Sequence, residues 1–165
     1  MDPLRINDTV TMRPAVAEDG FFLRQVYAST RNAELSTVGW TDQQREAFLD
    51  MQFNAQSRCY PKADNRIVLL RDSPIGRMLI NTTEEMISLV DIALLEPYRN
   101  AGIGSALIQA LQERALAQRK PIRLHVLASS RAIRLYERLG FSISGGDAVY
   151  LEMTWTPPGV NGDSV

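Results

Sequence analysis

The chain has 165 residues, a formal net charge of −1 and 45% hydrophobic residues, which fits one globular domain with a substantial core. The near-neutral charge excludes a strong electrostatic field for nucleic acid, and no apolar run is long enough to span a membrane. Because the N-terminus also lacks the apolar core of a signal peptide, we expect a cytoplasmic protein that binds neither nucleic acid nor a membrane.

The predicted elements alternate between strand and helix patterns. Thr41 is a capping residue before a helical repeat, and Asp72-Ser73-Pro74 is typical of a turn between strands. Pro121 ends a helix, whereas Gly140 suits the position just after one. In chain order we predict a strand (9–13), two helices (18–29 and 41–57), a hairpin (66–71 and 75–81), a strand (86–94), a helix (105–120), a strand (122–127), a helix (129 or 130 to 139) and a closing hairpin (141–144 and 149–155). This order predicts a mixed α/β sheet in a single domain over residues 1–155, followed by a disordered tail over 156–165.

A turn with two glycines joins the strand at 86–94 to the helix that follows it. Its sequence, residues 99 to 104, is Arg-Asn-Ala-Gly-Ile-Gly. Backbone N–H groups at a helix start are unpaired, and Gly102 and Gly104 carry no side chain that would keep a ligand away. The positive end of the helix dipole adds to the attraction for a phosphate group. The turn therefore predicts either an anion-binding site or a close turn that needs glycine for steric reasons.

Two motifs resemble those of the Gcn5-related N-acetyltransferases (GNAT). The family signature Arg/Gln-x-x-Gly-x-Gly/Ala is matched by Arg99, Gly102 and Gly104. A second motif, Ala-x-x-x-Tyr-x-x-x-Gly-Phe, is matched by Ala132, Tyr136, Gly140 and Phe141, and the close resemblance covers about residues 86–141. The resemblance implies a mixed, mostly antiparallel sheet of six to seven strands with about four helices, in which the fourth and fifth strands splay apart.

The resemblance also implies a cofactor, acetyl-coenzyme A, that enters between the splayed strands. Its pantetheine arm would pair with the backbone around Ile92 and Leu94, and its pyrophosphate would bind the N–H groups of residues 99–105. The sequence departs from the family pattern at two places. Glu96-Pro97 stands where the family more often has Pro-Glu, and Ser129 stands where the family often has an asparagine. The implied cofactor-binding residues are Ile92, Ala93, Leu94, Arg99, Asn100, Ala101, Gly102, Ile103, Gly104, Ser105, Ser129 and Tyr136.

Acetyl transfer to an amine needs a proton acceptor for the ammonium and a proton donor for the departing thiolate. The resemblance places Tyr136 beside the cofactor sulfur as the donor; the alternative is a tyrosine that only packs against Phe141. Asp91 lies in an apolar strand, where burial would raise its pKa and make it a better base. Strand alternation places Asp91 on the same face as Leu89 and Ala93. The alternative for Asp91 is an ion pair with an arginine.

Other polar residues are weaker candidates for the site. His125 is a further catalytic candidate as a proton relay, or else a hydrogen-bonded structural residue, and Glu84 and Glu85 fit a solvent-exposed turn. Cys59 excludes an internal disulfide; we expect it in a loop remote from both motifs, without a covalent enzyme intermediate. With one cysteine and one histidine, no metal site is expected. The resemblance implies that the acceptor pocket lies at the first two helices, their connecting loop and the last hairpin. There the acceptor-binding candidates are Glu34, Trp40 and Tyr150, and exposed loop packing would explain these residues equally well.

The sequence thus predicts an acetyltransferase that moves acetyl from acetyl-coenzyme A directly to a primary amine of a small molecule or peptide, with a homodimer left open. One rival is a non-catalytic acyl-coenzyme A-binding sensor or regulatory module of the same fold. A second rival, a nucleotide-binding α/β domain, requires a Gly-x-Gly-x-x-Gly turn after the first strand. Here the glycines come past the middle of the chain, and Leu107 stands where the third glycine would be.

Overall fold

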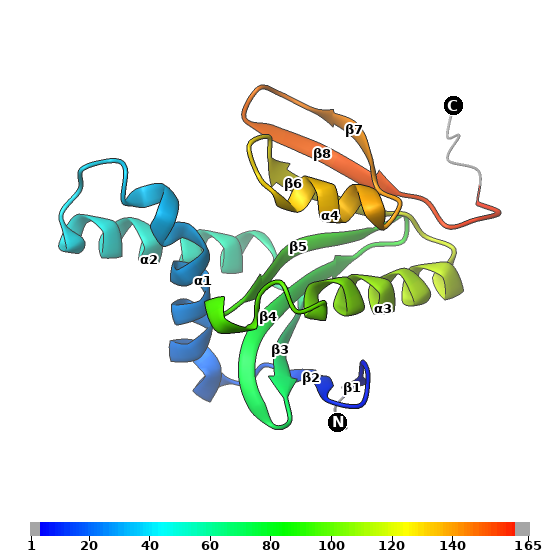
Figure 1. Ribbon diagram of the computed structural model, residues 1–165, viewed down its shortest axis with the longest axis horizontal. Coiled ribbons are helices and arrows are strands. Elements are labelled where there is room, and N and C mark those ends of the chain that lie inside the picture. Colours follow the sequence, from blue (N-terminus) through cyan, green and yellow to red (C-terminus); the bar gives the residue numbers. More distant parts are fainter. Residues whose placement is uncertain (1–3, 161–165) are drawn as a thin grey trace.

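The computed structural model describes residues 4–160, apart from the side chains of residues 32–34. Over this range an eight-stranded sheet runs in the order β1-β2-β3-β4-β5-β6-β8-β7, and every pair is antiparallel except β5 with β6 (Figure 1). The mostly antiparallel sheet was predicted, whereas the strand count exceeds six to seven because a two-residue strand pairs at the N-terminal edge. The strands are β1 (Leu4–Arg5), β2 (Val10–Pro14), β3 (Asp64–Leu70), β4 (Ser73–Thr82), β5 (Ile87–Leu94), β6 (Ile122–Leu127), β7 (Ser142–Gly146) and β8 (Tyr150–Trp155).

Helices cover both faces of the sheet (Figure 1). Over the described residues the four α-helices are α1 (Gly20–Leu35), α2 (Asp42–Cys59), α3 (Ile103–Gln118) and α4 (Ala132–Arg138). On β3, Val68 joins the core on the side of α3, whereas Ile67 and Leu69 pack with Leu23 of α1. This alternation follows from the two-residue period of a strand. Short 3-10 turns precede α1 at Ala17–Asp19 and follow β5 at Glu96–Tyr98.

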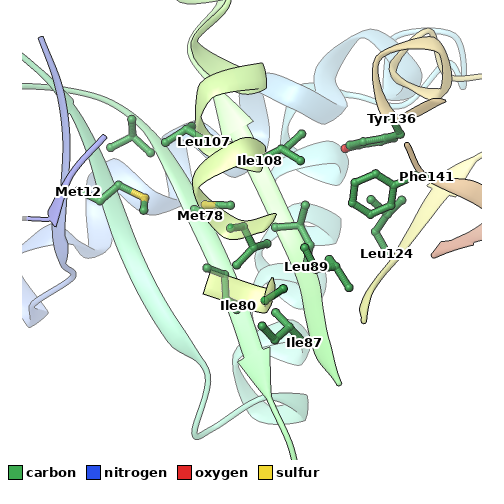
Figure 2. Close-up of a cluster of buried hydrophobic side chains, with 14 of the residues drawn as sticks. Met12, Met78, Ile80, Ile87, Leu89, Leu107, Ile108, Leu124, Tyr136 and Phe141 are labelled. Atoms are coloured by element: carbon green, nitrogen blue, oxygen red, sulfur yellow. The ribbon is translucent and has the colours of Figure 1, made fainter. Parts of the chain in front are cut away.

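The main core lies between α3, α4 and the sheet. Figure 2 shows Leu107 and Ile108 of α3 above Met78 and Leu89 of the sheet, with Tyr136 beside Ile108. Leu107 and Ile108 are fully buried, and each such side chain contributes about 1.5–3 kcal/mol by leaving water. Because α3 is anchored by these contacts, the position of its N-terminus against β5 is fixed.

The helix boundaries differ from the prediction at several points. α1 extends to Leu35, six residues beyond the predicted end at Ser29. α2 starts as expected, with Thr41 accepting a hydrogen bond from the Gln44 backbone, but it runs on through Cys59. The prediction that Cys59 lies in a loop is therefore wrong: it is the last, exposed residue of α2. Helical hydrogen bonds continue there because no proline or glycine interrupts the chain before Pro61.

The strands β5 and β6 pair over only a short stretch. Ile87, Ser88 and Leu89 pair with Ile122, Arg123 and Leu124, and no further pairs join the two strands. On its other side β5 pairs with β4 as far as Leu94, and β6 pairs with β8 as far as Leu127. Within the described chain, the edge of β5 from Val90 to Leu94 that faces β6 thus has no strand partner. The splay predicted for the fourth and fifth family strands is present between β5 and β6.

A β-bulge changes which residues of β5 share a face. Leu89 lies opposite Ile80 and Asp91 lies opposite Leu79, so Val90 is an extra residue in β5. The extra residue reverses the alternation at this point. The prediction that Asp91 shares a face with Leu89 is therefore wrong: Leu89 packs in the α3-side core, whereas Asp91 lies against Arg77 on the side of α2.

Candidate functional site

A cavity of about 860 Å³ lies along the part of β5 that is not paired with β6, between the start of α3 and α4. Ile92, Ala93 and Leu94 line it from the unpaired edge of β5. From the glycine turn and the start of α3, the lining residues are Arg99, Asn100, Gly102, Gly104, Ser105 and Ile108. From α1 and α4 they are Thr30, Arg131, Ala132, Arg134, Leu135, Tyr136 and Arg138. The cavity therefore brings together most of the residues predicted to hold the cofactor, with Ala101, Ile103 and Ser129 outside its lining.

The glycine turn presents backbone N–H groups to this cavity. Asn100 and Gly102 have left-handed backbone, with φ of +61° and +82°. The first hydrogen bond of α3 runs from the Ala106 N–H to the Gly102 carbonyl. The N–H groups of residues 103–105 precede it and have no acceptor within the described part of the chain. These donors, with the positive end of the α3 dipole, form an anion-binding arrangement.

Space and anchoring at the turn also suit a ligand. A Cβ added at Gly102 or Gly104 would meet no protein atom within 4 Å, so the volume in front of both glycines is open. The Arg99 side chain holds the turn to the strand, because its Nε donates to the Leu94 carbonyl at 2.8 Å. The turn is thus fixed by Arg99, while its glycines leave room for a group against the backbone.

Tyr136 lies at the inner end of the cavity on α4. Its side chain is 8% exposed and packs edge-to-face on Phe141, with ring centroids 5.8 Å apart. In Figure 2 the hydroxyl points towards Ile108 of α3. Desolvation by burial, with the charge of Asp91 as a smaller cause, raises the pKa of Tyr136 to about 12. The phenol is therefore protonated throughout the neutral range and is a hydrogen-bond donor.

Asp91 lies in a buried network built around Arg77. Arg77 is 2% exposed, and its guanidinium donates to Asn65 Oδ1 at 3.0 Å and to Gln56 Oε1 at 2.9 Å. The same group lies 3.5 Å from Asp91 Oδ2. Burial raises the pKa of Asp91, although the charges of Arg31 and Arg77 lower it. Both alternatives for Asp91 therefore have a physical basis, because the carboxylate is desolvated and is also paired with an arginine.

The network reaches the first helix through Arg31. The Arg31 guanidinium stacks on the Tyr27 ring, 3.6 Å from its centroid, and donates to Thr30 Oγ1 at 2.8 Å. Thr30 itself lines the cavity. Arg31, Arg77 and Asp91 thus lie close together beside the cavity, and their charges add up to a net positive charge. Burial is also the largest cause that raises the pKa of Tyr27.

Several predicted site residues lie away from the cavity lining. His125 points out of β6 with its side chain 62% exposed, 3.7 Å from Glu152 on β8. Ser129 is exposed, and the neighbouring Ser130 hydroxyl instead accepts a hydrogen bond from the Ala132 N–H. Trp40 packs on Phe48 between α1 and α2.

The remaining candidates are exposed or fall outside the described side chains. Tyr150 begins β8 and is 52% exposed. Glu84 and Glu85 lie in the exposed turn between β4 and β5, as expected. The side chain of Glu34 lies outside the part of the structure that is described.

Sequence reasoning missed three arginines, one just before α4 and two within it, and the buried Arg77. The spacing of Arg131, Arg134 and Arg138, at i, i+3 and i+7, was a readable signal for one helix face. Arg77 carried no such signal, since its partners Gln56 and Asn65 come from other elements.

These features define the class of protein. A splayed mixed sheet, an open strand edge and a glycine turn at a helix start are the elements of an acyl-coenzyme A-binding acetyltransferase fold. The Acetyltransferase (GNAT) family profile matches residues 23–141, which is more than half of the chain. The chain belongs to the GNAT acetyltransferase family. No curated protein is similar enough in sequence to be matched.

Solved structures of acetyltransferases have the same fold. PaiA N-acetyltransferase from Thermoplasma acidophilum, in complex with coenzyme A, has a TM-score of 0.71 at 16% identity, over 90% of this chain and 99% of that one. Arabidopsis thaliana Naa50, in complex with the bisubstrate analogue CoA-Ac-MVNAL, has a TM-score of 0.62 at 17% identity, over 90% and 99%. An acetyltransferase from Salmonella typhimurium that modifies the N-terminal serine of ribosomal protein L7/L12 has a TM-score of 0.64 at 17% identity, over 94% and 99%. No helix in residues 4–160 is long and apolar enough to cross a membrane.

Proposed function

We propose that the chain is an N-acetyltransferase that transfers acetyl from acetyl-coenzyme A directly to a primary amine. The observation that carries the proposal is the continuous cavity from the glycine turn, along the open edge of β5, to Tyr136. An extended amide chain can pair with the unpartnered backbone of Ile92 and Leu94 as an added strand would. The free N–H groups of residues 103–105 are donors for the pyrophosphate. Solved structures of the same fold that contain coenzyme A or its bisubstrate analogue support the same cofactor.

Bound acetyl-coenzyme A would supply an activated thioester carbonyl. We propose that Tyr136 gives its proton to the sulfur as the carbon–sulfur bond breaks, because its phenol is protonated and lies at the inner end of the cavity. Asp91 is the proposed proton acceptor for the ammonium of the substrate. Since Asp91 does not line the cavity, we propose that the proton reaches it through a water molecule.

For the acceptor, we propose an amine of a peptide or small molecule that enters beside α1 and the β7–β8 hairpin. Relatives with this fold include enzymes with peptide or protein acceptors, the bisubstrate-bound Naa50 and the acetyltransferase that modifies the L7/L12 N-terminus. Trp40 and Tyr150 expose aromatic surface in this region.

The test combines cofactor titration with an amine panel. Acetyl-coenzyme A is titrated first, and release of free thiol is then followed with amino acids, polyamines and short peptides as acceptors. The proposal predicts saturable cofactor binding and acceptor-dependent thiol release, both measured against Tyr136→Phe. Binding without turnover for every acceptor would favour the rival sensor function, for which the pairing of Asp91 with Arg77 is the favouring observation. Absence of binding would refute both.

A further inference from the structure

The lining of the cavity is strongly basic. Four of its residues are arginines, Arg99, Arg131, Arg134 and Arg138, and among the residues and side chains that the structure describes no aspartate or glutamate lines it. Several arginines outside the cavity have acidic partners; Arg24 of α1, for example, contacts both Glu46 and Asp50 of α2. The chain as a whole has a formal net charge of −1, so this positive excess is local to the cavity.

The arginines of α4 form a row along one side of that helix. Arg131 directly precedes the helix, and Arg134 and Arg138 follow at i+3 and i+7, within a narrow arc at 3.6 residues per turn. All three are exposed, and none has a carboxylate within 4.0 Å among the residues that the structure describes. Arg99 donates to the Leu94 carbonyl, whereas the side chains of these three arginines make no hydrogen bond to any residue that the structure describes. Their charges therefore remain available to a ligand in the cavity.

Coenzyme A carries two separate anionic groups. Its pyrophosphate has two charges, and its ribose 3′-phosphate is a monoester with a charge of about −1.5 to −2 at neutral pH. The glycine turn offers donors for one of these groups, the pyrophosphate, so the monoester needs its own cations. Arginine suits that role, since its guanidinium makes paired hydrogen bonds to phosphate oxygens.

We propose that Arg131, Arg134 and Arg138 form the seat of the ribose 3′-phosphate, so that the protein distinguishes coenzyme A from its 3′-dephospho form. This inference rests on the proposed function, because it assumes that the cofactor enters this cavity. Each part of the site then has its own role: the glycine turn binds the pyrophosphate, and the three arginines bind the ribose 3′-phosphate.

The test compares the dissociation constants of coenzyme A and 3′-dephospho-coenzyme A by calorimetry at one fixed salt concentration. For the wild type we expect coenzyme A to bind at least about tenfold more tightly. Each of Arg131→Gln, Arg134→Gln and Arg138→Gln should weaken coenzyme A by roughly 3- to 10-fold, as expected for charge-assisted contacts that are partly exposed to solvent. The triple variant should bring the ratio of the two constants close to one. Arg58→Gln on α2 removes the same charge outside the cavity and should leave the ratio unchanged.

The outcomes separate this inference from the proposed function. Binding of 3′-dephospho-coenzyme A also serves as a folding control, because the triple variant should retain it within about twofold if the row contacts only the terminal phosphate. Equal affinity of the wild type for both ligands would overturn the inference while leaving the proposed function standing. Equal losses for both ligands in the triple variant would also overturn it, since the row would then bind another part of the molecule. If the wild type bound neither coenzyme A nor 3′-dephospho-coenzyme A, the proposed function itself would be refuted.

Discussion

Replacing Gly102 by glutamate tests the anion-binding turn directly. Gly102 has φ of +82°, and an added Cβ would meet no protein atom within 4 Å, so the free protein has room for the side chain. The cost in stability comes from the left-handed backbone, about 1–2 kcal/mol for a residue with a Cβ. In a chain of this size that cost lowers Tm by roughly 2–8 °C. We therefore expect a folded variant.

The cost in binding should be larger. A carboxylate about 5 Å from one phosphate charge repels it by about 3 kcal/mol at an effective dielectric constant near 20. The side chain also fills the open space in front of the N–H groups of residues 103–105. We expect the dissociation constant of coenzyme A to rise by well over tenfold, which corresponds to more than about 1.4 kcal/mol. Isothermal titration calorimetry measures the constant, and thermal melting measures the change in stability.

Two control variants separate the causes. Gly102→Ala has the same backbone strain without the charge, so it should lose much less affinity. Gly159→Glu places the same side chain at a glycine with the same φ of +82° and open surroundings, outside the cavity, and should bind coenzyme A normally. If Gly102→Glu is folded and binds coenzyme A as tightly as the wild type, the anion-binding assignment is wrong. Equal losses in the alanine and glutamate variants would assign the effect to the backbone instead.

Three further predictions concern the chemistry and the start of α3. Tyr136→Phe should reduce turnover by roughly 10²–10⁴-fold with little change in cofactor affinity; unchanged turnover, with chemistry rate-limiting, would make Tyr136 a packing residue only. Turnover should fall at acid pH when Asp91 becomes protonated, and because the pKa of Asp91 is raised, this acid limb should lie above the usual range of an aspartate. Tyr136, with a pKa of about 12, should cause no loss of turnover below about pH 11. Asp91→Asn should remove the acid limb, whereas a retained limb would leave Asp91 as the partner of Arg77. Gly104→Ala should stabilise the protein by about 0.5–1 kcal/mol in urea denaturation, because the added Cβ meets no atom within 4 Å; a loss of stability would contradict that open space.

Local sequence patterns predicted several ends of helices and strands in the second half of the chain. The strand at 122–127 has the predicted ends, and Gly140 follows α4 with φ of +94°, as the left-handed position after a helix requires. Such features depend on neighbours within a few residues. The same locality explains why Arg119, whose φ is +57° at the end of α3, was not recognised, because arginine has no preference for left-handed backbone.

Long-range relations escaped the sequence. A bulge is one extra residue whose position depends on the partner strand, so the reversal at Val90 that turns Asp91 away from Leu89 has no local signature. Arg77 interrupts an apolar strand, and its partners lie 21 and 12 residues away in the chain. His125 also interrupts an apolar strand but points outward. Sequence alone could not separate these two cases, because burial of a polar residue depends on distant hydrogen-bond partners.

The three residue pairs between β5 and β6 have a consequence for how the molecule holds together. Next to these pairs, the Ile87 N–H donates a hydrogen bond to the Pro121 carbonyl, at the same end of β5 and β6. A ligand along the open part of β5 would act as a cross-link between two parts of the sheet whose strands otherwise pair only at one end. Bound at a hundred times its dissociation constant, it would add about 2.7 kcal/mol of stability. Amide hydrogens of β8, which does not line the cavity, should then exchange more slowly, and the supply of cofactor would set the rigidity of the C-terminal third of the chain.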